Sequence, residues 1–247
     1  SPMDWPLASR FDEMDAIVVF DDVLVPWERV FIFRDIDSAN AIYRKSHGVV
    51  HMAHQFVTKD LAKAEFMMGI AFSLARAAKV DEFLHIQGML TELINMTETV
   101  RACVIASEAG ASDTPFGTVM PDRWPLEAMR FNFPSMFKRA CDIIQTIGAG
   151  GLMMVPSAAE LNGELKADVD RYAQAVNANS STRINLYRLA VDASTSGFSG
   201  RQQLYERYFA GDPVRAAAMV YNSYETGVHR DRIEGFLETT HKVTHNS

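Results

Sequence analysis

Three long stretches with few helix breakers constrain this chain more than any other feature of its sequence. Between Val57 and Lys79 there is no proline and only one glycine, and apolar side chains occupy nearly every face of a helix drawn through the segment. That pattern is typical of a helix buried by several neighbours. Residues 81–109 repeat apolar side chains about every 3.6 positions, which predicts a second helix.

A third long helix is predicted over residues 126–147, although Pro134 should kink or restart it. Shorter helices are expected further on, at 183–192, 201–209 and 214–224. Asp212 and Pro213 fit the N-cap and first position of the last of these. The ten C-terminal residues are polar, and we expect them to fray. The body of the chain is therefore predicted to be a helical bundle.

The first 32 residues have a different, extended character. Three short apolar runs are expected to be β-strands, at 16–20, 23–25 and 30–32. A sheet that small is marginal in water unless it packs against something else. We therefore assign 1–35 to the end of a β-domain, 36–235 to a helical bundle domain and 236–247 to a tail, and expect the chain to be the C-terminal part of a longer polypeptide.

Composition excludes several classes of protein. The chain has 24 Lys+Arg against 31 Asp+Glu, a formal net charge of −7, and no basic cluster, so we predict no binding to nucleic acid. The sequence contains no run of about 18 uncharged apolar residues, so we predict no membrane span. There is no secretion signal, and the only two cysteines fit a reducing compartment, so a cytoplasmic protein is expected.

Three histidines could converge on a metal if their segment is helical. His47, His51 and His54 stand at i, i+4 and i+7, which share one helix face. Gly48 weakens the helix, and the first pair lacks the glutamate of the His-Glu-x-x-His signature. We therefore predict no metal site. The alternatives are that one of the histidines contacts substrate or caps a helix, and that the others only pack in the core.

Two glycine-containing stretches are candidate ligand sites. Gly148–Gly151 reads as a left-handed helix cap, with a weak resemblance to a phosphate loop. Residues 194–196 supply hydroxyl groups ahead of Gly197 and Gly200, with Arg201 adjacent, which could cradle a phosphate or a polar ring edge. An ordinary interhelical turn is the alternative. Hydrolase, nucleoside triphosphatase and nicotinamide dehydrogenase motifs are absent.

Several segments together carry a family resemblance: residues 11–15, 19–30, 83–104, 145–151 and 196–207. The stretch from Asp21 to Val30 is the most specific of them. Over roughly residues 8–225 the chain resembles the C-terminal half of the 4-hydroxyphenylacetate 3-hydroxylase family, the oxygenase components of two-component flavin monooxygenases. The resemblance implies a mainly α fold: an acyl-CoA dehydrogenase-like C-terminal four-helix bundle preceded by the last strands of a β-domain.

The resemblance also implies which residues lie near FAD. One group would lie near the flavin adenine of a neighbouring subunit: Gln145, Gly148, Gly150 and Gly151. A second group would lie against the flavin: Thr195, Ser196, Gly197, Phe198, Ser199, Gly200 and Arg201. No catalytic residue is assigned, because the Arg, Tyr and His that the family places around its phenol have no counterpart in this chain.

The function implied is ortho-hydroxylation of a phenol such as 4-hydroxyphenylacetate, with O2 and with FADH2 supplied by a separate flavin reductase. The bundle would pair subunits into a homo-oligomer, a dimer or a tetramer. We expect the isolated chain not to hydroxylate phenols. The alternatives are a non-catalytic helical oligomerisation module and a relative of 4-hydroxybutyryl-CoA dehydratase without its iron–sulfur cluster, since Cys103 and Cys141 lie inside expected helices.

Overall fold

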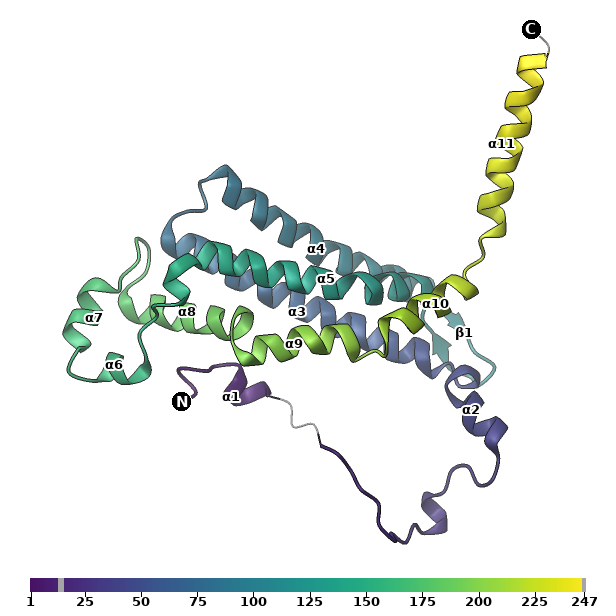
Figure 1. Ribbon diagram of the computed structural model, residues 1–247, viewed down its shortest axis with the longest axis horizontal. Coiled ribbons are helices and arrows are strands. Elements are labelled where there is room, and N and C mark those ends of the chain that lie inside the picture. The colour runs from purple at the N-terminus through teal and green to yellow at the C-terminus, as the bar shows by residue number, and fades with distance from the viewer. Residues whose placement is uncertain (13–15, 246–247) are drawn as a thin grey trace. The chain divides into compact units, whose positions relative to one another are not determined.

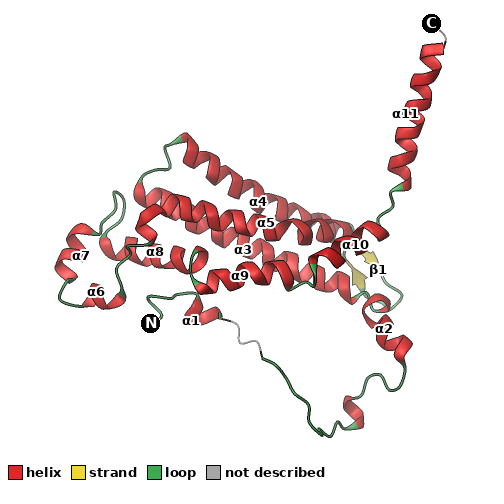
Figure 2. Ribbon diagram, viewed as in Figure 1, coloured by secondary structure: helices red, strands yellow, loops and turns green. Residues whose placement is uncertain are grey.

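The computed structural model describes residues 1–12 and 16–245, and the described chain is almost entirely helical (Figures 1 and 2). The α-helices are α1 Ala8–Phe11, α2 Ile36–Lys45, α3 Gly48–Ala78, α4 Leu84–Ala109, α5 Arg123–Gly148, α6 Ala158–Asn162, α7 Lys166–Tyr172, α8 Ser180–Ser194, α9 Gly197–Tyr208, α10 Pro213–Ser223 and α11 Gly227–His245. Two 3-10 turns are η1 Trp27–Arg29 and η2 Ala149–Leu152. The strands β1 Ser112–Asp113 and β2 Val119–Met120 form a short antiparallel hairpin.

Four helices enclose one apolar core. The long helices α3, α4 and α5 lie side by side (Figure 1), and α8 packs against both α3 and α5. Leu74, Val100, Ile144 and Ala190, one from each helix, are fully buried. The predicted mainly α fold class is confirmed. None of the helices in the described part of the chain is long and apolar enough to be a candidate membrane span.

The helix boundaries differ from the predicted ones in two informative places. α3 begins at Gly48 because His47, with φ 57°, has a left-handed backbone that ends the preceding turn. α5 runs through Pro134 without restarting. The ring of Pro134 removes one backbone hydrogen bond, but Phe133 and Phe137 on either side are 2% and 4% exposed. Tertiary packing of these rings holds the helix together across the proline.

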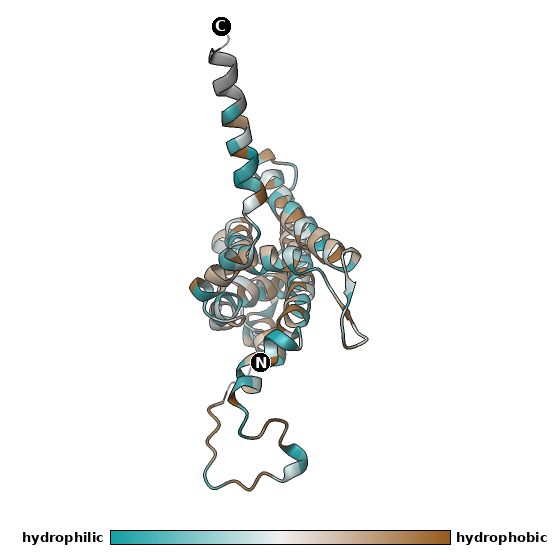
Figure 3. Ribbon diagram, turned by 90° about the vertical axis from the view of Figure 1, so that its right-hand side faces the viewer, coloured by the Kyte–Doolittle hydropathy of each residue, from teal (hydrophilic) through white to brown (hydrophobic). Residues whose placement is uncertain are grey.

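The N-terminal segment does not form the predicted strands. Within 16–32 the structure has only η1, and the rest has no regular hydrogen-bonded structure. Ile17, Leu24 and Phe31 are more than 90% exposed, and Figure 3 shows hydrophobic stretches along this segment. A strand needs a neighbour for its backbone N–H and C=O groups, and no described segment pairs with this one. Residues 13–15, part of one resembling stretch, lie outside the described residues.

A buried carboxylate attaches the first helix to the bundle. Oδ2 of Asp192 in α8 accepts hydrogen bonds from the backbone N–H groups of Leu7 (2.7 Å) and Ala8 (2.8 Å). Asp192 is fully buried. These N–H groups at the start of α1 have no partner within the helix, so Asp192 caps α1 from a distant part of the chain.

The chain divides into two compact units, Ser1–Ala210 and Gly211–Ser247. In the second unit α10 starts as predicted, with Asp212 as N-cap and Pro213 in the first turn. The Asp212 carboxylate accepts from the N–H of Arg215 at 2.9 Å. α11 continues to His245 rather than fraying from residue 238, and residues 246–247 lie outside the described part. The domain boundaries proposed from the sequence remain a prediction.

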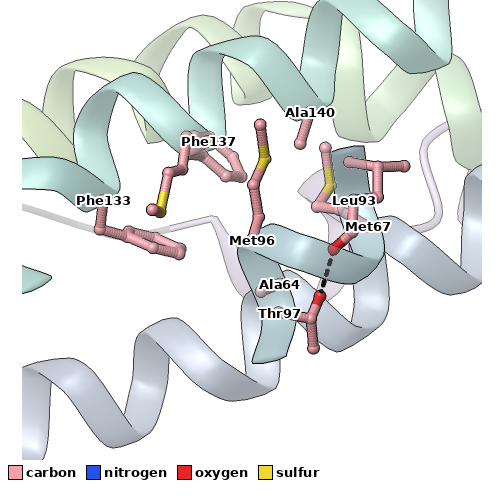
Figure 4. A pocket seen from close by; sticks show the side chains of 9 residues that line it. Ala64, Met67, Leu93, Met96, Thr97, Phe133, Phe137 and Ala140 are labelled. Carbon is pink, nitrogen blue, oxygen red and sulfur yellow. Dashed lines mark hydrogen bonds between the residues drawn. The ribbon is translucent and has the colours of Figure 1, made fainter. Parts of the chain in front are cut away.

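A small apolar cavity lies between α3, α4 and α5 (Figure 4). Methionine side chains, among them Met67 and Met96, point into it beside the rings of Phe133 and Phe137. The only hydroxyl in its lining, on Thr97, donates to the carbonyl of Leu93 at 2.9 Å. The cavity therefore offers no free polar group to a ligand and belongs to the packing of the core.

Replacement of Leu74 by alanine tests the enclosure of α3. Leu74 has no exposed surface, so Leu74→Ala should lower the free energy of unfolding by about 2–5 kcal/mol in urea titrations. Leu84→Ala is the matched control, because Leu84 is 84% exposed and its truncation should change stability by less than about 0.5 kcal/mol. Equal losses in the two variants would contradict this account of the core.

Candidate functional site

The two glycine-containing stretches predicted to lie near a cofactor meet in the fold. Gln145, in the last turn of α5, donates from Nε2 to the carbonyl of Ser194 at 2.5 Å. Ser194 is the last residue of α8 and directly precedes the second stretch. The side chain of Cys141, one turn before Gln145, lies 3.9 Å from the hydroxyl of Ser199 in α9. The end of α5 and the α8–α9 junction therefore form one continuous region.

The glycines at the end of α5 allow close packing. A Cβ on Gly151 would lie 2.6 Å from the ring of Tyr187, and a Cβ on Gly148 would lie 2.6 Å from Leu152. The helix ends within this stretch as predicted, but the predicted left-handed conformation of its cap is wrong. The positive φ, 46°, falls on Ala149 with ψ −146°, outside the left-handed helical region.

The α8–α9 junction is tighter than the predicted break over 193–200. α8 continues to Ser194, and α9 already begins at Gly197. Ser196 is the N-cap: its hydroxyl accepts from the N–H of Ser199 at 3.2 Å and donates to Asp192 Oδ1 at 2.8 Å. Gly197 and Gly200 thus lie in the first turn of a helix, where backbone N–H groups suit an anionic or electron-rich partner.

Exposure separates the predicted cofactor contacts into three groups. Six are exposed: Gln145, Gly150, Thr195, Gly197, Gly200 and Arg201. Three are half-buried: Gly151, Ser196 and Phe198. Gly148 and Ser199 are buried, so we assign these two to packing within the chain. The remaining nine could contact a ligand.

Three of the exposed glycines have room beside them. Among the described residues, a Cβ placed on Gly150, Gly197 or Gly200 would meet no atom within 4 Å outside its own local backbone. None of the three has a positive φ. Neither backbone conformation nor packing inside this chain therefore requires glycine at these positions. Bare backbone beside open space is the shape that a planar ligand could approach closely.

Arg201 is oriented by an ion pair. Its guanidinium contacts the carboxylate of Asp12, and the two side chains are 57% and 44% exposed. Ion pairs this exposed contribute little to stability. Arg201 can therefore exchange Asp12 for an anionic ligand at small cost.

A second cluster, which the sequence analysis missed, lies between α3 and α9. One carboxylate oxygen of Glu206 in α9 forms an ion pair with Lys59 at 2.6 Å, and the other forms an ion pair with Lys63. Lys59 also forms an ion pair with Asp60 at 2.7 Å. The carboxylates of Asp60 and Glu206 are almost fully buried. Two lysines one turn apart in a mainly apolar helix could have indicated a buried counter-charge.

Burial shifts the pKa values of the side chains in this charge cluster. Desolvation raises the pKa of Asp60 to about 7 against the opposing effect of Lys59. Burial also lowers the pKa of Lys63, and the pull of Glu206 only partly offsets it. For Lys59 burial acts to lower the pKa, but the carboxylates of Asp60 and Glu206 outweigh it and raise the pKa.

The three histidines do not form a common site. His47 precedes α3 and its ring lies 6.1 Å from that of Phe116, whereas His54 contacts Glu108 at 3.0 Å. Among the described residues no group of three or more His, Cys, Asp or Glu side chains could hold a metal ion.

The fold defines the chain as a helical-bundle protein, in which the end of α5 meets the α8–α9 junction. A family model described as 4-hydroxyphenylacetate 3-hydroxylase C terminal matches residues 39–238, and one described as the N terminal of the same enzyme matches residues 1–32. The chain belongs to the 4-hydroxyphenylacetate 3-hydroxylase family, as the sequence resemblance predicted.

Individual relatives agree with this membership. The chain is 40% identical over 243 residues to the 4-hydroxyphenylacetate 3-monooxygenase oxygenase component of Thermus thermophilus, covering 98% of this chain and 50% of that protein. It is 40% identical to a probable 4-hydroxyphenylacetate 3-monooxygenase of Bacillus subtilis, covering 96% and 49%. The chain thus spans about half the length of the curated relatives it matches.

Solved structures show the same fold. A crystal structure of a 4-hydroxyphenylacetate 3-monooxygenase oxygenase component complexed with FAD and 4-hydroxyphenylacetate superposes with a TM-score of 0.93 at 40% identity, over 99% of this chain and 51% of that one. An archaeal 4-hydroxybutyryl-CoA dehydratase superposes with a TM-score of 0.80 at 17% identity, over 89% and 44%. The second likeness concerns the fold alone.

The raised pKa of Asp60 predicts how stability depends on pH. The folded pKa, about 7, exceeds the unfolded value, so the folded chain holds this proton more tightly and stability falls as pH rises between about 4 and about 7. Asp60→Asn should flatten this part of the profile, measured by urea unfolding at several pH values.

Asp170→Asn is the control for that experiment. Asp170 is exposed and its pKa is lowered by hydrogen bonds from Lys166 and Ser180, so its contribution is lost only below about pH 4. The control should keep the unsubstituted slope above that pH. An unchanged slope in Asp60→Asn would show that Asp60 is ionised throughout.

Proposed function

We propose that this chain forms the FAD-contacting helical part of a flavin-dependent oxygenase that hydroxylates phenols. The observation that carries the proposal is the hydrogen bond from Gln145 to Ser194, which joins the two stretches that the family resemblance places near FAD. Open space beside Gly150, Gly197 and Gly200 in the same region supports it. These positions fit a cofactor better than they fit a purely structural turn.

The residues of the region have complementary roles toward FAD. The first turn of α9 offers backbone N–H groups, Thr195 offers an exposed hydroxyl, and Arg201 offers a guanidinium to the electron-rich edge or the phosphates of the cofactor. Bound in its reduced form, FAD would supply the chemistry that activates O2 and delivers one oxygen atom to the ring carbon ortho to a phenol hydroxyl. The chain itself holds and orients the cofactor.

The names of the relatives guide the substrate and the partners that we propose. Relatives are named as acting on 4-hydroxyphenylacetate and, in a Rhodococcus protein 30% identical to this chain, on 4-nitrophenol; both are phenols. We propose a phenol as substrate and a separate reductase as the source of reduced FAD. The proposed site contacts only the cofactor, so we expect no phenol hydroxylation by the 247-residue chain alone. Exposed apolar side chains on α4, such as Ile94 and Ile105, support pairing into a homo-oligomer.

FAD titration tests the proposal directly. FAD fluorescence should be quenched on addition of the chain. Gly197→Leu fills the space beside the backbone, and Arg201→Gln removes a charge. Each should weaken binding by roughly 1.4 kcal/mol or more, which raises the dissociation constant for FAD at least about tenfold. A Cβ at position 197 meets no neighbouring atom, so the melting temperature should stay within a few degrees of the unsubstituted value.

Gly88→Leu is the matched control, because Gly88 lies in the second turn of α4 and a Cβ there also meets no described atom within 4 Å. It should leave FAD affinity unchanged. A chain that does not bind FAD at all would favour the alternative, a non-catalytic helical oligomerisation module. Binding that survives both site substitutions would move the cofactor to another surface.

A further inference from the structure

Helix α9 has no fully buried apolar side chain. Of its twelve residues, the two that are buried, Ser199 and Glu206, are both polar. Among its larger apolar side chains, Leu204 and Tyr208 are 57% and 53% exposed, and Phe198 and Tyr205 are half-buried. An apolar stripe can slide along its partner with modest loss, whereas buried hydrogen-bonded groups specify one position. The polar contacts of α9 therefore decide where it lies.

Two lysines one turn apart on α3 hold two acceptors one turn apart on α9. Lys59 and Lys63 each contact one carboxylate oxygen of Glu206. Lys63 also donates to the side-chain carbonyl of Gln202 at 2.8 Å. Since Gln202 and Glu206 lie one turn apart, a shift of α9 by one turn, about 5.4 Å, would carry one of them to the place of the other and separate Glu206 from Lys59. We call these four residues the α3–α9 clamp.

Aromatic rings surround the two lysines of the clamp. The ammonium of Lys59 lies 5.0 Å from the ring centre of Tyr205 and 5.6 Å from that of Phe133, and the ammonium of Lys63 lies 4.9 Å from that of Phe137. Cation–π attraction and the low local dielectric strengthen the ion pairs. Loss of one partner would leave a buried charge without compensation. Because that state is costly, the ion pairs favour the one position of α9 in which every charge is paired.

The α9 residues of the clamp follow the proposed cofactor contacts along the same helix. Gln202 follows Arg201 in sequence, and Gly197 and Gly200 occupy the preceding turn of the same helix. At its start, α9 is held by the Ser196 cap, which hydrogen-bonds to Asp192. The exposed face of that first turn is thus fixed from both sides by polar contacts.

We propose that Lys59, Lys63 and Glu206 are positioning residues for the flavin site: their buried ion pairs set the register of α9 and so hold Gly197, Gly200 and Arg201 where FAD binds. The proposal rests on the proposed function for its cofactor. None of the three residues needs to touch FAD. A purely stabilising ion pair is the competing explanation.

The double variant Lys63→Met/Glu206→Gln separates positioning from stability. It removes one cation and one anion together, keeps both side chains near their original length, and leaves Lys59 with Asp60. Exchange of a buried pair for uncharged groups is often neutral for stability, so the melting temperature should stay within a few degrees. Hydrogen–deuterium exchange of residues 197–202 should become several-fold faster, and the dissociation constant for FAD should rise at least about tenfold.

Arg139→Met/Glu92→Gln is the matched control. This pair also joins two helices, α4 and α5, with both hydrogen bonds at 2.8 Å, but its side chains are about 40% exposed and it does not contact α9. It should change neither exchange of residues 197–202 nor FAD affinity. An equal effect in control and clamp variants would assign the change to general loosening and overturn the proposal.

Two further outcomes are decisive. A folded clamp variant with unchanged exchange and unchanged FAD affinity overturns the proposal. If the clamp variant does not fold, Gln202→Leu, which removes one bond to Lys63 without changing charge, must still speed exchange of residues 197–202, and failure to do so also overturns it. If the unsubstituted chain binds no FAD, the proposed function fails, while the exchange data still decide whether the clamp orders α9.

Discussion

Enclosure of α3 on several sides is the constraint on which the rest of the unit Ser1–Ala210 depends. This helix packs against α4, α5 and α8, and Val57, Ala71 and Leu74 along its length have no exposed surface. Exposed residues of α3 such as Glu65 and Arg76 lie along one stripe. Lys59 and Lys63 lie away from that stripe, and their side chains are only 31% and 20% exposed. Lys59 and Lys63 must therefore be neutralised inside the protein, and Glu206 of α9 does so. Packing of the core thus determines where α9 can lie.

Glycine serves two different purposes in the α5–α8–α9 region. Gly148 and Gly151 are glycine because neighbouring side chains leave no room for a Cβ, whereas nothing within the chain explains Gly197 and Gly200. The first pair lets the end of α5 approach α8 closely. The second pair leaves backbone bare at the start of a capped helix. The second pair supports the proposed cofactor site through its place at a capped helix start, and the sequence alone does not distinguish the two purposes.

Local patterns predicted the helices well and the strands poorly. Periodic apolar residues identified α3, α4 and α5, and Asp212 with Pro213 marked the start of α10, because these signals act within a few residues. The apolar runs in 16–32 are not strands, since a strand depends on a partner elsewhere. The Ser- and Gly-rich composition of 193–200 indicated a long break, but Ser196 caps α9 at once.

The sequence by itself determined the helical content and the family, because motifs and periodicities depend on residues close together in the chain. It also predicted two stretches near a cofactor. Only the tertiary structure decided which of those residues meet. The bond from Gln145 to Ser194 spans 49 positions and the pair of Lys59 and Glu206 spans 147. Periodicity tells which face of a helix is buried, but not which helix covers it. That choice is made by the packing of the whole bundle, and with it the placement of every residue at the candidate site.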